Sequence, residues 1–134
     1  YPPRSPEPGV PAFGAAPHSD FGTLTLLAQD GVGGLQVRDT TGAWIDAPPI
    51  ADTFVVNVGD LLARWSNGRF ASTPHRVVNP LGKERYSVAM FVDPNWDSIV
   101  NPVTRAGERP KHEPVRCADY IMERYDEAFA YRRS

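Results

Sequence analysis

The sequence is short of cysteine, of long apolar runs and of net charge. Its single cysteine, Cys117, cannot form an internal disulfide framework, which fits a reducing compartment such as the cytoplasm. No apolar stretch approaches the length of a membrane span, so no membrane contact is expected. A formal net charge of −2 gives no basic surface for nucleic acid. These features favour a cytoplasmic globular protein with neither a membrane nor a nucleic acid as partner.

The sequence also has no initiator methionine. It opens on the run YPPRSPEPGVPAFGAAP, whose many prolines and glycines predict an extended, irregular segment. We therefore expect these 134 residues to be part of a longer protein and to belong to one domain.

Short β-type runs separated by turn residues make up most of the chain. Strands at this spacing are typical of a mainly β sandwich or barrel. Apolar side chains at helical spacing over residues 117–133 predict one amphipathic C-terminal helix packed on the β core. The dipeptide Asn67-Gly68 predicts a hairpin turn. The β-type runs are residues 23–29, 35–39, 43–48, 52–60, 61–66, 75–80 and 85–94.

His18 and Asp20 are separated by one residue, so their side chains share a face if the segment is extended. Such a pair is either a polar surface turn or two ligands of a metal site. For a third ligand we prefer His75, at the start of a β-type run, to His112, in a polar loop flanked by prolines. Two histidines and one carboxylate form the facial triad of non-haem Fe(II) oxygenases, although the same donors suit catalytic zinc.

Arg85 and Ser87 are also two residues apart on a β-type run. A guanidinium offers a planar fork that matches a carboxylate, and a serine hydroxyl can add one hydrogen bond. The pair therefore predicts a carboxylate receptor, and the alternative is an exposed pair on an edge strand.

With these motifs in this order, the sequence resembles the Fe(II)- and 2-oxoglutarate-dependent oxygenases, and more narrowly their isopenicillin N synthase-like branch. The resemblance continues through TLTLLAQDGVGGLQV, GAWIDAPP, FVVNVGDLLARWSNGRFASTPHRVVN and ERYSVAMFVDPN. It implies a double-stranded β-helix, also called a jelly roll or cupin-like fold, with a C-terminal α-helix. Residues 1–134 would then be the C-terminal part of the catalytic domain, without the N-terminal half of the family.

The resemblance also implies roles for single residues. His18, Asp20 and His75 would bind Fe(II) and act in catalysis, while Arg85 and Ser87 would hold the distal carboxylate of 2-oxoglutarate.

Two aromatic residues complete this implied site. Tyr1 stands where relatives place a tyrosine that contacts the co-substrate. Phe91 follows the Arg-x-Ser pair as an aromatic of the substrate pocket, or else packs in the core.

The function that the resemblance implies is oxidation of a small molecule with Fe(II), 2-oxoglutarate and O₂, releasing succinate and CO₂. Two alternatives stay open: a 2-oxoglutarate-independent Fe(II) oxidase that grips its substrate's own carboxylate with Arg85 and Ser87, and a metal-binding jelly roll without redox chemistry. We also expect this segment alone to aggregate, or to pair with the missing N-terminal half, because a barrel without its flanking layer exposes apolar surface and strand edges.

Overall fold

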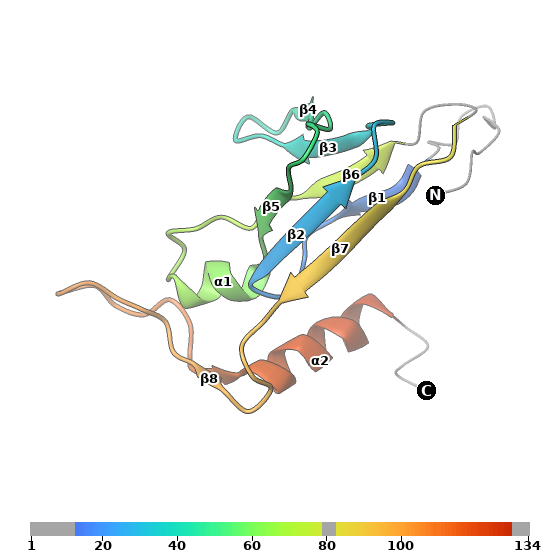
Figure 1. The fold of residues 1–134 in the computed structure, drawn as a ribbon. Helices are drawn as coiled ribbons and strands as arrows, with labels where there is room; N and C mark the ends of the chain where they lie inside the picture. Colours follow the sequence, from blue (N-terminus) through green and yellow to red (C-terminus); the bar gives the residue numbers. More distant parts are fainter. Residues whose placement is uncertain (1–12, 79–82, 130–134) are drawn as a thin grey trace. The chain divides into compact units, whose positions relative to one another are not determined.

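The computed structural model of the chain describes residues 13–78 and 83–129 (Figure 1). Within these residues short strands are followed by a C-terminal helix, as the sequence predicts. The elements are β1 (Phe13–His18), β2 (Leu24–Gln29), β3 (Leu35–Arg38), β4 (Trp44–Asp46), β5 (Val55–Val58), α1 (Asp60–Trp65), β6 (His75–Val78), β7 (Ser87–Val92), β8 (Ile99–Val100), β9 (Val115–Arg116) and α2 (Cys117–Ala128).

The strands form a four-stranded sheet of order β1-β6-β3-β4, a three-stranded sheet of order β5-β2-β7 and the pair β8-β9. Strands far apart in the sequence are therefore neighbours, which is the connectivity of a double-stranded β-helix and confirms the predicted fold class. In the first sheet, β6 pairs antiparallel with both β1 and β3.

Two compact units divide the described residues. The first comprises residues 13–19, 26–57, 73–78 and 83–90, and the second the remainder. In the first unit Leu35 of β3 and Val77 of β6 are cross-strand partners, and both side chains are buried. A buried pair of this kind fixes the strand register, because a shift by one residue would turn each apolar side chain to the other face.

The second unit holds α1, α2, β8 and β9. Its core consists of Leu61, Val100, Cys117 and Ile121, so both helices contribute buried apolar side chains. Arg124 of α2 forms an ion pair with Asp60 at the start of α1, with 3.0 Å between Nη2 and Oδ2. The predicted C-terminal helix is confirmed, and none of the described helices has the length and apolar composition needed to cross a bilayer.

Residues 61–66 correct one sequence prediction, since they belong to α1 and its C-cap rather than to a strand. Asn67 and Gly68 do not form the predicted hairpin. Both have left-handed φ values, 57° and 81°, and the Gly68 N–H donates to the carbonyl of Ala63. This is the Schellman ending of a helix, which uses the same residue types as a hairpin turn.

The opening segment corrects a second prediction. Residues 13–17 belong to a segment that the sequence predicts to be extended and irregular, but together with His18 they form strand β1, because their backbone pairs with β6. Pairing with a neighbouring strand outweighs the local effect of glycine and proline here.

Candidate functional site

His18 and His75 are brought together by strand pairing. His18 is the last residue of β1, His75 is the first of β6, and the two are cross-strand partners. Their ring centroids lie 4.3 Å apart. The two imidazoles therefore lie side by side at one end of the four-stranded sheet.

Each ring is oriented by a backbone carbonyl two residues earlier in the chain. Nδ1 of His18 lies 2.7 Å from the oxygen of Ala16, and Nδ1 of His75 lies 3.1 Å from the oxygen of Thr73. Because a carbonyl only accepts, these contacts favour the neutral tautomer of each ring that has its proton on Nδ1 and its lone pair on Nε2. Histidines that bind metals are typically held in this way, so both rings are prepared as Nε2 ligands.

Asp20 supplies the carboxylate. Asp20 lies two residues after His18 in the chain, and His18, Asp20 and His75 are a candidate ligand group among the described residues. The Thr25 hydroxyl donates a 2.5 Å hydrogen bond to Oδ2 of Asp20. Two imidazoles and one carboxylate fit an Fe(II) facial triad, so the donor set suits the metal that the sequence predicts.

The backbone after Asp20 lies against the start of α1. The N–H groups of Gly59 and Asp60 donate to the carbonyls of Thr23 and Asp20, each over 2.8 Å. The first N–H groups of a helix have no partner within the helix, and here the loop provides one. Helix α1 therefore helps to hold the backbone of Asp20, the candidate carboxylate ligand.

Gly59→Ala tests this support. A Cβ at position 59 would collide with the carbonyl oxygen of Gly22 and lie 3.0 Å from that of Asp20. We expect a loss of about 3 kcal/mol in the free energy of unfolding, as for other overpacked sites, and weaker Fe(II) binding. Thermal unfolding and iron titration measure the two effects. Gly31→Ala is the matched control because its Cβ would have no heavy atom within 4 Å; equal behaviour of the two variants would contradict the prediction.

Arg85 is fully buried, with 0% of its surface exposed, and its guanidinium is held by three partners of the first unit. Nε donates to the Gly33 carbonyl over 2.7 Å, Nη2 to Oε1 of Gln29 over 2.9 Å, and Nη1 to the Ser87 hydroxyl over 3.1 Å. The predicted pair Arg85 and Ser87 is thus in direct contact. The alternative of an exposed pair on an edge strand is wrong for Arg85.

Asp30 fixes the backbone beside this arginine. Its carboxylate accepts hydrogen bonds from the N–H groups of Tyr86 and Val32, over 2.5 Å and 3.0 Å. Its pKa is lowered, first by the Tyr86 hydrogen bond and then by that of Val32. A lowered folded-state pKa means that this anchor is present near neutral pH and is lost as the pH falls through that value.

The remaining predicted residues have different outcomes. Tyr1 lies outside the described residues. Phe91 lies in β7 and is 62% exposed in this chain, and its role in a substrate pocket stays a prediction. His112 is exposed in a bend of the chain, which confirms its placement in a surface loop.

Sequence reasoning missed three residues that support the site: Gln29, Thr25 and Gly59. Gln29 and Thr25 lie on β2, and their spacing only predicts that side chains four residues apart share a strand face. Neither contact partner, Arg85 or Asp20, follows from that spacing.

The chain is similar to known proteins in both sequence and structure. The family model described as the 2OG-Fe(II) oxygenase superfamily matches residues 1–94. The 2-oxoglutarate-Fe(II) type oxidoreductase hxnY of Emericella nidulans is 42% identical over 120 residues, which are 87% of this chain and 34% of that protein. A bi-functional coumaroyl CoA and feruloyl CoA ortho-hydroxylase of Ipomoea batatas is 42% identical over 132 residues, 96% of this chain and 37% of the relative.

A solved structure is similar as well. It is a full-length Neurospora crassa protein in complex with alpha-KG, that is 2-oxoglutarate, and thymine. The TM-score is 0.79 at 44% sequence identity, over 86% of this chain and 37% of that one. The chain thus spans little more than a third of the length of these three proteins.

Proposed function

Because the chain belongs to the 2OG-Fe(II) oxygenase superfamily, we propose that it forms the Fe(II)- and 2-oxoglutarate-binding part of an oxygenase that oxidises a small molecule. The observation that carries this proposal is the cross-strand pairing of His18 with His75, whose ring centroids lie 4.3 Å apart, with Asp20 two residues after His18. Both relatives named above have oxidoreductase or hydroxylase activity in their names.

His18, Asp20 and His75 would hold the metal through two Nε2 atoms and a carboxylate oxygen. The Ala16 and Thr73 carbonyls keep the two rings in the correct tautomer, and the Thr25 hydroxyl orients the carboxylate. When bound, Fe(II) and 2-oxoglutarate supply the oxidising chemistry, in which O₂ and 2-oxoglutarate give succinate, CO₂ and an oxidised substrate.

Arg85 and Ser87 receive the distal carboxylate of 2-oxoglutarate. The guanidinium is buried, where a charge-assisted hydrogen bond to a carboxylate is stronger than in water. The Ser87 hydroxyl next to Nη1 adds a donor at the same place. The pair therefore selects a ligand that carries a carboxylate at a fixed distance from its metal-binding end.

An anaerobic titration of the whole protein tests the function. Fe(II) is added first and 2-oxoglutarate second, while visible absorption is recorded and succinate release is measured after O₂ is admitted. We expect an absorption band that requires both additions, since a 2-oxo acid that chelates Fe(II) gives a charge-transfer transition. Iron binding without the band would favour an oxidase that uses Arg85 for the substrate's own carboxylate. Binding of zinc in preference to iron would favour a non-redox site.

We further propose that the rest of the protein covers an apolar face of the sheet β5-β2-β7. Ser87 contacts Arg85, which contacts Gln29, so Ser87 and Gln29 share one face of this sheet. Side chains alternate along a strand, and Val88 and Met90 of β7 therefore lie on the other face. They are 71% and 56% exposed, far more than valine and methionine side chains usually are in a complete domain. Relatives carry nearly two thirds of their length outside this region, which is enough to cover it.

The expected result for the chain expressed alone is self-association through this face. Light scattering should give an apparent mass of at least twice that of the monomer, and Val88→Lys should reduce it, because a charge on the patch opposes apolar contact. Val103→Lys is the control, since Val103 is 53% exposed in a loop. A monomeric wild-type chain at the same concentration would refute this proposal.

The single cysteine fits a reducing compartment, and we propose a cytoplasmic location on that basis. Cell fractionation tests this directly.

A further inference from the structure

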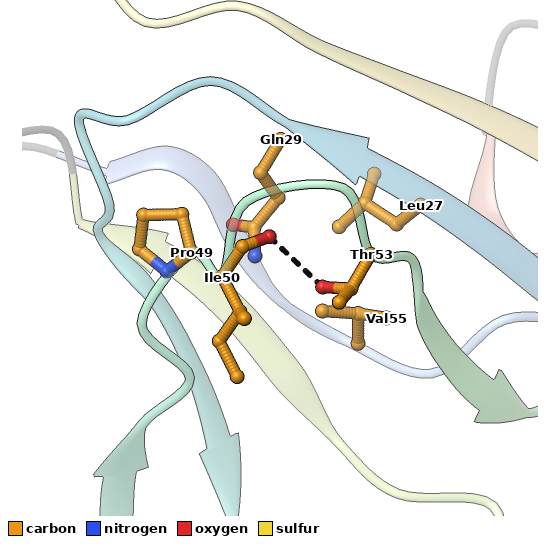
Figure 2. A pocket seen from close by; sticks show the side chains of 6 residues that line it. All are labelled: Leu27, Gln29, Pro49, Ile50, Thr53 and Val55. Carbon is orange, nitrogen blue, oxygen red and sulfur yellow. Dashed lines mark hydrogen bonds between the residues drawn. The ribbon is translucent and has the colours of Figure 1, made fainter.

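Gln29 connects the buried arginine to a small pocket. Its side chain lines a small open pocket, and Figure 2 shows it beside Leu27, Pro49 and Thr53. The remaining lining residues are Ile50 and Val55. The Thr53 hydroxyl donates a hydrogen bond to the Ile50 carbonyl over 2.9 Å. Gln29 is one of two lining side chains that carry a hydrogen-bonding group.

The hydrogen bond between Arg85 and Gln29 fixes the orientation of the Gln29 amide and also that of the Arg85 guanidinium. Arginine only donates, so the amide oxygen must face Nη2 and the amide nitrogen must point elsewhere. Nε and Nη2 lie along the same side edge of a guanidinium. The Gly33 carbonyl and Gln29 Oε1 therefore hold that one edge, at 2.7 Å and 2.9 Å.

Two hydrogen bonds along one edge define the plane of the guanidinium as well as its position. The Ser87 hydroxyl lies at Nη1, away from this edge. A carboxylate that contacts both Arg85 and Ser87 must then approach the Nη1 corner. Gly33 and Gln29 both contribute to this direction of approach, and of the two only Gln29 acts through a side chain.

We propose that Gln29 is a positioning residue for the carboxylate receptor: its amide oxygen, 2.9 Å from Nη2, turns the Arg85 guanidinium so that the Nη1 corner and Ser87 meet the ligand's distal carboxylate together. This inference rests on the proposed function of Arg85. It assigns to Gln29 no contact with the iron or with the reacting atoms. Gln29 therefore controls affinity for the distal carboxylate and leaves metal binding unchanged.

Gln29→Met tests the assignment, because methionine has a similar length and volume but no strong acceptor. The ligands are 2-oxoglutarate and 2-oxopentanoate, which has a methyl group in place of the distal carboxylate. Dissociation constants are measured with the anaerobic Fe(II) form of the whole protein by the absorption change and by calorimetry. We expect the constant for 2-oxoglutarate to rise about tenfold, the usual effect of losing one hydrogen bond to a charged group. The constants for 2-oxopentanoate and Fe(II) should not change.

Gln29→Glu provides the second variant, which keeps an acceptor for Nη2 and adds a negative charge beside the receptor. It should weaken 2-oxoglutarate binding at least as much, again with little effect on 2-oxopentanoate. Gln36→Met is the control, because Gln36 contacts Arg76 and Asp46 in the other sheet.

The outcomes separate this inference from the function on which it rests. A wild-type protein that binds both ligands equally would overturn the role of Arg85, and the role of Gln29 with it. A wild-type preference for 2-oxoglutarate that both Gln29 variants retain in full would overturn the role of Gln29 alone. Parallel losses for the two ligands would also overturn it, since they would indicate general damage to the fold.

Discussion

Asp20→Ala should reduce Fe(II) affinity by at least about 100-fold and abolish succinate formation, since removing even an outer partner of a metal ligand costs about 10–100-fold. The substitution removes the one carboxylate of the group formed with His18 and His75. Two neutral imidazoles alone neither balance the metal charge nor complete the three-ligand face. Iron titration of the anaerobic whole protein measures the affinity, and a succinate assay measures turnover.

Two matched variants accompany this experiment. Asp97→Ala removes an exposed carboxylate and should leave both quantities unchanged. Thr25→Val removes the hydroxyl that orients Asp20, and it should weaken iron binding about tenfold, as loss of an outer partner does. Full turnover by Asp20→Ala would remove Asp20 from the ligand set.

Arg85→Lys should raise the dissociation constant of 2-oxoglutarate about 100-fold, which corresponds to about 2.8 kcal/mol. Lysine keeps the positive charge but presents a single ammonium group. It cannot contact Gly33, Gln29 and Ser87 from the three corners of a plane, as Arg85 does. Fe(II) affinity should stay within a few-fold of wild type, so that the loss appears only when 2-oxoglutarate is added.

Arg38→Lys serves as the control for this variant, because Arg38 is exposed and donates to the Gly42 carbonyl of its own turn. If the protein grips its substrate's carboxylate instead, Arg85→Lys will raise the KM for the substrate and leave 2-oxoglutarate without effect in both proteins. Unchanged affinity for both compounds would contradict the carboxylate receptor.

The ligand set shows how far sequence reasoning extends. His18 and Asp20 are two residues apart, and such a pair is visible in any sequence. The choice of His75 over His112 followed from its place at the start of a β-type run, and the structure has His75 at the start of β6. What the sequence did not show was strand β1, whose pairing with β6 makes His18 and His75 cross-strand partners.

Residues 61–66 show where the sequence alone is insufficient, since it predicts a strand and the structure has a helix. Short apolar runs fit a strand or a helix equally well, and the following Asn67-Gly68 is common to hairpins and to helix ends. The choice was made by tertiary contacts: Leu61 packs in a core with Val100 and Ile121, and the start of the helix finds carbonyl partners in residues 20–23.

The sequence by itself determined the mainly β class, the C-terminal helix, the donor types of the candidate metal site and the pairing of Arg85 with Ser87. These follow from residue types and spacings of a few positions, where covalent geometry limits the possible arrangements. Only the tertiary structure decided which strands are neighbours, which carbonyls set the histidine tautomers, and that Gln29 holds the buried guanidinium of Arg85. These contacts join residues from different strands or depend on local backbone conformation, and both are fixed only when burial and strand pairing select one fold.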